Sequence, residues 1–111
     1  MLDFERLDVY QKALEFVVLA YQIIDNLPVG SGSVVDQLKR AAMSIPLNIA
    51  EASGRVRRPD RERFHSIARG SAMECAAILD VIKATDRLDE QTHQLGKQII
   101  GRIVAMLSKM C

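Results

Sequence analysis

Apolar residues recur every three or four positions along nearly the whole chain, the spacing at which side chains share one face of an α-helix. Four segments show this period, and they cover residues 9–26, 34–53, 60–87 and 90–110. The first segment carries two neighbouring apolar stripes, one through Tyr10, Ala13, Leu14, Val17, Tyr21 and Ile24 and the other through Val9, Phe16, Ala20 and Ile23. The pattern predicts an all-α chain without strands.

Residues that favour helix ends separate these segments. Asp8 and Ser33 each have a polar residue three positions on, and Asp89 precedes the fourth segment, so these three are expected N-caps. Pro59 suits the first turn of the third helix, and Gly54 suits the C-terminal end of the second. Short connections favour antiparallel packing of consecutive helices. The prediction is one domain over residues 1–111, an antiparallel up-down-up-down four-helix bundle.

The second helix contains Pro46 in its interior. Proline removes one backbone hydrogen bond and clashes with the preceding turn, which predicts a kink between Ala42 and Pro46. The core residues expected from this helix are Val35, Leu38, Ala41 or Ala42, Ile45, Ile49 and Ala52. Those expected from the third are Phe64, Ile67, Ala68, Ser71, Cys75, Ile78, Leu79 and Ile82. Those expected from the fourth are Leu95, Ile99, Ile103, Met106 or Leu107, and Met110.

Composition agrees with a small domain that has its own core. The chain has 111 residues, of which 49% are hydrophobic and 26% charged, and its net charge is +1. Cys75 and Cys111 are the only cysteines, too few for a disulfide framework or a structural zinc cluster. The longest uncharged stretches contain ten residues, about half of a membrane span, and no apolar signal sequence begins the chain. We expect a cytoplasmic protein.

The apolar surface of the first helix is wider than one core face needs, and the third and fourth helices extend similarly. Monomeric proteins seldom expose large apolar patches. Self-association is therefore expected, and the alternative is a monomer with a thick core and scattered surface apolar residues.

Two Glu-x-x-His motifs, Glu62–His65 and Glu90–His93, are of the kind that holds paired metal ions in helical bundles. If the third and fourth helices are antiparallel neighbours, the motifs lie at opposite ends, roughly 35–40 Å apart at about 1.5 Å per residue. A shared metal site is therefore not expected. The candidate nucleophiles, Ser44, Ser71 and Cys75, lack a nearby activating base. We expect no enzymatic activity, no metal and no cofactor.

Positive charge is concentrated in the middle of the chain. Residues 39–69 contain eight basic and three acidic residues, although the whole chain is nearly neutral. The candidate phosphate contacts are Arg55, Arg57, Arg58, Arg61 and Arg63 around one turn, with Lys39 and Arg69 as weaker candidates. Arginine suits phosphate oxygens, and Phe64 is the only aromatic residue nearby, so backbone contacts are favoured over base stacking. The alternative is a solvated turn whose arginines pair with acids.

The segment Gln37–Glu51, which reads QLKRAAMSIPLNIAE, resembles the QxxRAxxSIPxNIAE signature of the bacterial four helix bundle protein family. That family includes proteins encoded in intervening sequences of 23S ribosomal RNA genes. The chain also resembles the accessory variability determinants of diversity-generating retroelements. Phe64–Ser71 matches the F-x-x-IA-x-GS stretch of the family, and Phe4, Leu7 and Tyr10 fit its opening.

The resemblance implies a barrel-shaped homopentamer with a central pore. For the retroelement members it implies binding of nucleic acid and of a partner reverse transcriptase through basic surfaces. It also assigns structural roles to Arg40, Ser44, Pro46, Asn48, Glu51, Gly70, Ser71 and Glu74. Ser44 and Asn48 are expected to satisfy backbone groups that Pro46 frees. Arg40 is expected to pair with Glu51 or Glu74.

The leading hypothesis is a non-enzymatic, homo-oligomeric helical bundle that presents a basic surface to RNA or DNA. The alternative is a structural or protein-interaction scaffold without a nucleic-acid role. Clustered arginines favour the first hypothesis, and the near-neutral net charge favours the second.

Overall fold

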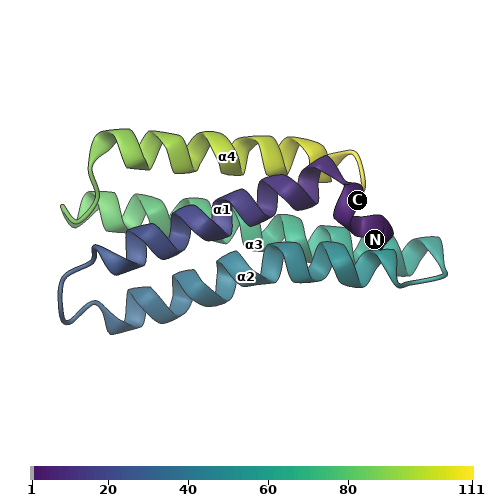
Figure 1. Ribbon diagram of the computed structural model, residues 1–111, viewed down its shortest axis with the longest axis horizontal. Coiled ribbons are helices and arrows are strands. Elements are labelled where there is room, and N and C mark those ends of the chain that lie inside the picture. Colours follow the sequence, from purple (N-terminus) through teal and green to yellow (C-terminus); the bar gives the residue numbers. More distant parts are fainter. Residues whose placement is uncertain (1) are drawn as a thin grey trace.

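The amphipathic segments fold as α-helices in a computed structural model, which describes residues 2–111. A short 3₁₀-helix, η1 (Asp3–Arg6), precedes α1 (Asp8–Asp25), α2 (Gly32–Ser53), α3 (Arg58–Ala84) and α4 (Glu90–Ser108). Consecutive helices run in opposite directions along a body of 44 × 24 × 22 Å (Figure 1). The part of the chain that the structure describes contains no strand. The predicted antiparallel four-helix bundle is confirmed.

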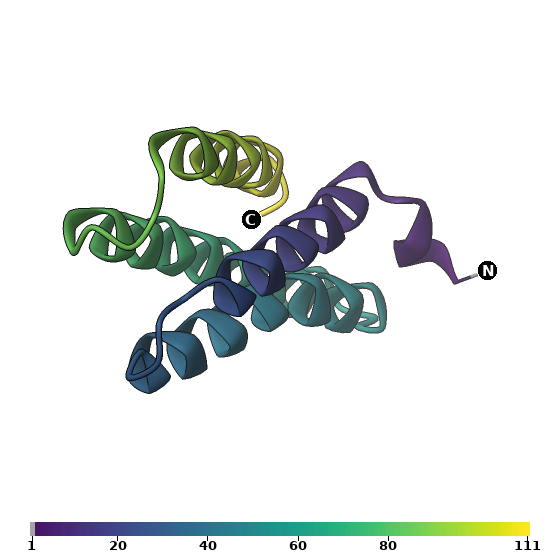
Figure 2. The same ribbon diagram turned by 60° about the vertical axis from the view of Figure 1, so that its left-hand side comes forward.

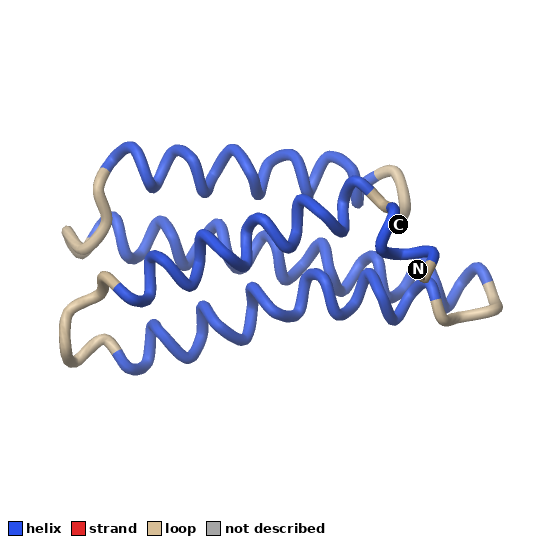
Figure 3. The backbone as a smooth tube through the Cα atoms, in the orientation of Figure 1, coloured by secondary structure: helices blue, strands red, loops and turns tan. Residues whose placement is uncertain are grey.

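Short connections alternate between the two ends of the bundle (Figure 3). The α1–α2 and α3–α4 connections lie at one end. The α2–α3 turn lies at the other end, together with both chain termini (Figure 1). When the molecule is turned, α4 is seen to pack against α3 on the side away from α2 (Figure 2). Among residues 2–111, no helix is both long enough and apolar enough to cross a membrane.

One core runs along the bundle and receives side chains from all four helices. Its largest completely buried side chains are Phe16, Leu38, Ile45, Ile49, Leu79, Ile82, Ile103 and Leu107. Burial of each such side chain contributes about 1.5–3 kcal/mol to folding. The core stripe predicted for α2 is buried as expected except at Val35, which is half-buried. In α3, the predicted residues Phe64 and Ser71 are half-buried and Ile67 is 39% exposed.

The core of α1 is formed mainly by the second of its two apolar stripes, together with Ala13 of the first stripe and Leu19, which lies in neither. Val9, Phe16 and Ile23 are buried, whereas Leu14 and Tyr21 of the first stripe are exposed. The helix packs one stripe inward, and the other remains partly uncovered along its outer side. This exposed stripe is the excess apolar surface that the sequence indicates.

The orientation predicted for α4 is wrong at its N-terminal half. Leu95 is 48% exposed, and Gly96 is buried in its place. A Cβ atom on Gly96 would lie 2.6 Å from Cδ1 of Leu79 and 3.6 Å from Cδ2 of Leu19. Helices α1, α3 and α4 meet at residue 96, and the absence of a side chain there permits their close approach.

Two of the three predicted N-caps are also wrong. Asp89 caps α4 as expected, since its Oδ2 accepts a hydrogen bond from the Thr92 backbone N–H at 3.0 Å. Asp8 is instead the first residue inside α1, and Ser33 lies inside α2 after a start at Gly32. Gly54 directly follows α2 as predicted, with a right-handed backbone conformation at φ −83°.

Helix α2 continues without interruption through Pro46, which is buried. The Asn48 amide donates to the Ser44 carbonyl at 2.8 Å and to Ser44 Oγ at 2.9 Å. The prediction for these side chains is therefore wrong in part, because the carbonyl that proline leaves without a donor belongs to residue 42. Ser44 Oγ also accepts from Ser71 Oγ at 2.8 Å, which fixes the register of α2 against α3. The kink between Ala42 and Pro46 stays a prediction.

Candidate nucleic-acid interface

The five predicted arginines gather at the end of the bundle where α2 turns into α3. Arg55 and Arg57 lie in the connection, and Arg58, Arg61 and Arg63 lie in the first two turns of α3. The backbone of Arg57 is extended, and Pro59 lies in the first turn of α3, where proline favours the start of a helix. The sequence therefore brings the five residues together as predicted, but their side chains have different surroundings.

Arg61 folds back onto the connection. Its Nη1 donates to the carbonyl of Val56 at 2.5 Å and to the carbonyl of Arg55 at 3.3 Å. These bonds satisfy two backbone acceptors that lie beyond the end of α2. Arg61 is half-buried and holds the shape of the turn, and its phosphate contact stays a prediction.

Arg55 and Arg63 lie against the ring of Phe64. Their guanidinium carbons are 4.7 Å and 5.5 Å from the ring centroid. Arg55 also pairs with Glu51 at 2.7 Å. The aromatic ring therefore positions two cations rather than offering a free face to a base.

Arg57 and Arg58 are exposed and contact neither the Phe64 ring nor the carbonyls of the turn. The Arg57 side chain makes no hydrogen bond or ion pair within residues 2–111 and is exposed. The Arg58 side chain is 80% exposed, and its Nε is 3.4 Å from Glu62 Oε2. An exposed ion pair of this kind contributes only about 0–1 kcal/mol to stability, so Arg58 can exchange Glu62 for a phosphate group at little cost.

Lys39 and Arg69 do not join this group. Lys39 Nζ lies 5.9 Å from the centre of the Tyr21 ring, beside α1. It precedes Arg55 by 16 residues, or about 24 Å of helix. Arg69 Nε donates to Ser108 Oγ at 2.8 Å and so joins α3 to the end of α4. The two weaker candidates contact neighbouring helices instead of extending the arginine cluster.

The two Glu-x-x-His motifs are separated along the bundle, as their positions on antiparallel helices predict. Glu62 faces Arg58, and His65 Nδ1 lies 3.2 Å from the Met110 carbonyl. In the described part of the chain, no three His, Cys, Asp or Glu side chains form a group that fits a metal ion. Glu62 therefore pairs within α3, whereas His65 contacts the segment that follows α4.

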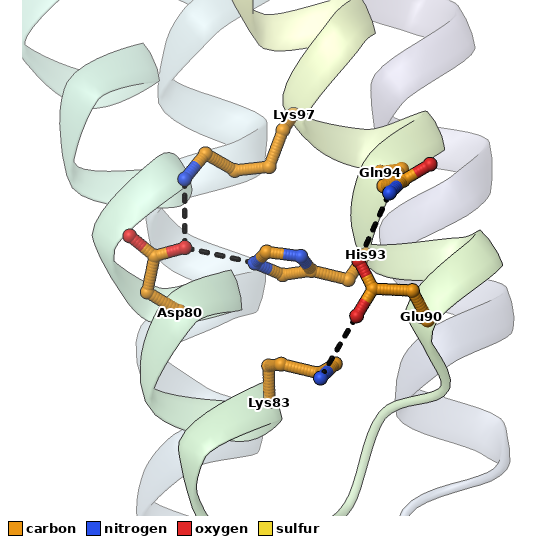
Figure 4. A network of polar contacts seen from close by, with 6 residues as sticks. All are labelled: Asp80, Lys83, Glu90, His93, Gln94 and Lys97. Atoms are coloured by element: carbon orange, nitrogen blue, oxygen red, sulfur yellow. Dashed lines mark hydrogen bonds and ion pairs between the residues drawn. The ribbon is translucent and has the colours of Figure 1, made fainter.

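The second motif belongs to a polar network between α3 and α4 (Figure 4). Asp80 Oδ1 accepts from Lys97 Nζ at 2.7 Å and from His93 Nε2 at 2.8 Å. Both hydrogen bonds hold the pKa of Asp80 below its usual range, and the bond from Lys97 has the larger effect. Glu90 accepts from Lys83 at 3.0 Å, and this contact also lowers the pKa of its carboxyl. Sequence reasoning missed Asp80 because its partners lie on the next helix.

Cys75 is completely buried. Burial, with a smaller contribution from the charge of Glu74, raises the pKa of its thiol to about 12. A thiolate is the nucleophilic form of cysteine, so Cys75 is an inert packing residue.

A family model for the 23S rRNA-intervening sequence protein matches residues 5–109. The chain belongs to this family. A search of curated proteins found no match. The fold is similar to a crystal structure from Bacteroides thetaiotaomicron VPI-5482, a protein of unknown function from the S23 ribosomal protein family. The TM-score is 0.83 at 25% identity, over 89% of this chain and 94% of that chain.

The segment of α2 that carries the family resemblance leaves one charged residue without its expected partner. Arg40 pairs with neither Glu51 nor Glu74, because Glu51 binds Arg55 and Glu74 makes no ion pair within residues 2–111. The prediction of an Arg40 ion pair inside the chain is wrong.

Gly70, next to Ser71, is exposed, and a Cβ atom there would meet nothing within 4 Å.

Proposed function

We propose that this family member is a non-enzymatic, self-assembling bundle that binds RNA or DNA through the arginines of its α2–α3 turn. The observation that carries the proposal is the accessibility of Arg57 and Arg58, with Arg63 held beside them on Phe64. Arginine binds phosphate oxygens in a bidentate manner and stays charged at all relevant pH values.

Contacts to the phosphate backbone fit this surface better than contacts to bases. Phe64 is half-buried and already has two guanidinium groups near its ring, so it offers no platform for stacking. The α2–α3 turn also lies at the end of the bundle, and residues 54–63 contain no aromatic side chain. We therefore expect binding that depends strongly on salt and weakly on sequence. The family description, which refers to 23S rRNA, is compatible with such a role.

Self-assembly is supported by apolar side chains that remain uncovered on two parts of the surface. The first, called the α1/α2 face here, contains Leu14, Val18, Tyr21, Met43 and Leu47. The second, called the α3 face, contains Ile67, Gly70, Met73, Ala77 and Val81. Isolated apolar residues on a surface are common, but rows of this length favour contact with another chain. Assembly would repeat the arginine turn and multiply its phosphate contacts.

The test compares two double variants that each lower the net charge of the chain by two. R57Q/R58Q acts at the α2–α3 turn, and the matched control Q91E/Q98E acts on exposed positions of α4. We expect R57Q/R58Q to weaken binding of a labelled duplex. The negative slope of log K against log salt should become less steep by about 2 per chain, whereas the control should keep the slope of the wild type. Equal slopes for wild type and R57Q/R58Q would contradict the proposed surface.

A scaffold that binds only protein is the second candidate, and the two exposed apolar faces are the observation that favours it. The two functions differ in one measurable respect, since the scaffold binds neither RNA nor DNA even at low salt.

A further inference from the structure

Two opposite charges lie unpaired within the exposed apolar surface. Arg40 projects from the outer side of α2 next to Met43 and Leu47, which are 41% and 59% exposed. Glu74 lies on the α3 face, where it is the only charged residue between Arg69 and Asp80. Neither side chain makes an ion pair with any residue from 2 to 111. A charge in an apolar surface is costly to cover unless the covering surface supplies its partner.

The surroundings of Glu74 fit a long cationic side chain. A groove of about 240 Å³ between α2 and α3 is lined by Val34, Gln37, Glu74, Ala77, Ile78 and Val81. Four of these residues are apolar, one is an amide and one is a carboxylate. The aliphatic stem of an arginine would pack on the apolar walls while its guanidinium reached Glu74 and the Gln37 carbonyl.

Arg40 and Glu74 lie at nearly the same height along the bundle. The hydrogen bond between Ser44 and Ser71 fixes the register of the two helices. Arg40 lies four residues from Ser44 and Glu74 lies three residues from Ser71, towards the same end because the helices are antiparallel. At about 1.5 Å per residue the two heights differ by about 1.5 Å.

Equal height has a consequence for assembly. When copies stand side by side with parallel axes, Arg40 of one copy reaches Glu74 of the next without a shift along the bundle. A head-to-tail contact without such a shift is compatible with a closed ring when the rotation between copies also closes, whereas a contact with a shift produces a helical filament.

We propose that Arg40 of one copy enters the α2/α3 groove of a second copy of this chain and pairs with Glu74 there. The proposal rests on the self-assembly described under Proposed function and names the contact that joins the copies. The α1/α2 face around Arg40 and the α3 face around Glu74 become buried against each other. Met43 and Leu47 then lie on either side of the height of Gly70, whose lack of a side chain permits close approach.

The experiment measures assembly mass by sedimentation velocity over a range of protein concentrations for wild type, R40E, E74R and R40E/E74R. Controls are Q98E and Q98R, which place either charge on an exposed position of α4. Far-UV circular dichroism checks that each variant is folded. We expect each single variant to raise the concentration needed for assembly about thirtyfold or more, and the double variant and both controls to assemble like wild type.

Mixing R40E with E74R separates a contact between copies from a pair inside one chain. Each mixed contact joins opposite charges, so the mixture should reach a mass above that of either variant alone. Single variants that assemble like wild type would overturn the Arg40–Glu74 contact and leave assembly itself standing. Failure of the mixture to gain mass would also overturn it. Wild-type protein that stays monomeric at every concentration would overturn the proposed assembly together with this contact.

Discussion

The two interior glycines of α4 provide a direct test of how this bundle packs. In G96A the new methyl group would lie 2.6 Å from Cδ1 of Leu79, a side chain that is completely buried. Overpacking of this kind costs about 1–3 kcal/mol, while alanine gains about 1 kcal/mol over glycine as a helix former. The expected net effect is a destabilisation of up to about 2 kcal/mol.

G101A is the matched variant in the same helix. A Cβ atom at Gly101 would meet nothing within 4 Å, so only the gain in helix propensity of about 1 kcal/mol remains. The two substitutions are chemically identical, yet their effects on the free energy of unfolding should have opposite signs. Their stabilities should differ by about 1–3 kcal/mol.

Urea denaturation followed by far-UV circular dichroism measures both variants. All samples need the same protein concentration, because assembly would make stability depend on it. G96A should unfold at a lower urea concentration than wild type, and G101A at a higher one. If G96A is as stable as G101A, the close packing of α4 against α3 at Gly96 is refuted.

Two further predictions concern single side chains. D80N keeps an oxygen acceptor at residue 80 but removes the negative charge that Lys97 and His93 share. Because the folded-state pKa of Asp80 is lowered, the contribution of this charge to stability is present above about pH 4 and is lost as the pH falls through the lower folded value. The urea midpoint of D80N should therefore lie below that of wild type at pH 7, and the gap should close towards pH 2, whereas a gap that is constant with pH would contradict this role. In a thiol titration with Ellman's reagent, Cys111 should react at once and Cys75 only in denaturant, since Cys75 is buried with a pKa near 12. Two rapidly reacting thiols in the native protein would show that the α3 core is open.

The fold was predictable because the apolar period of α2 has one interpretation. Leu38, Ile45 and Ile49 repeat at helical spacing against a polar remainder, and all three are buried. The period of α1 has two interpretations, since either of two adjacent stripes satisfies it. Only packing against the other helices decides that Phe16 points inward and Tyr21 outward. Local sequence does not contain this information.

The rotation of α4 was not predictable for a related reason. Hydrophobicity favours Leu95 over Gly96 as a core residue, but a Cβ atom at residue 96 would lie 2.6 Å from Cδ1 of Leu79 and would force that side chain to shift. Such a steric limit appears only when α1, α3 and α4 are placed together. The signal in the sequence is a glycine in the interior of a strong helical pattern, where it costs about 1 kcal/mol and needs a packing reason.

The position of the arginine cluster was predictable, whereas the role of each arginine was not. Closeness in sequence around one turn places the five residues together at one end of the bundle. The sequence does not show that Arg61 binds the carbonyls of the turn or that Arg55 lies on Phe64. Arg57 and Arg58 are exposed and make no contact of either kind, which narrows the candidate site.

The most direct test of the central claim is a fluorescence anisotropy titration of wild-type protein with labelled duplex DNA, structured RNA and single strands at about 50 and 200 mM salt. An assembly that makes six or more phosphate contacts should bind at least one of these ligands at micromolar concentration or tighter, and should lose about a thousandfold in affinity between the two salt concentrations. Absence of binding to all three ligands at the lower salt concentration would contradict a nucleic-acid function and favour the protein scaffold.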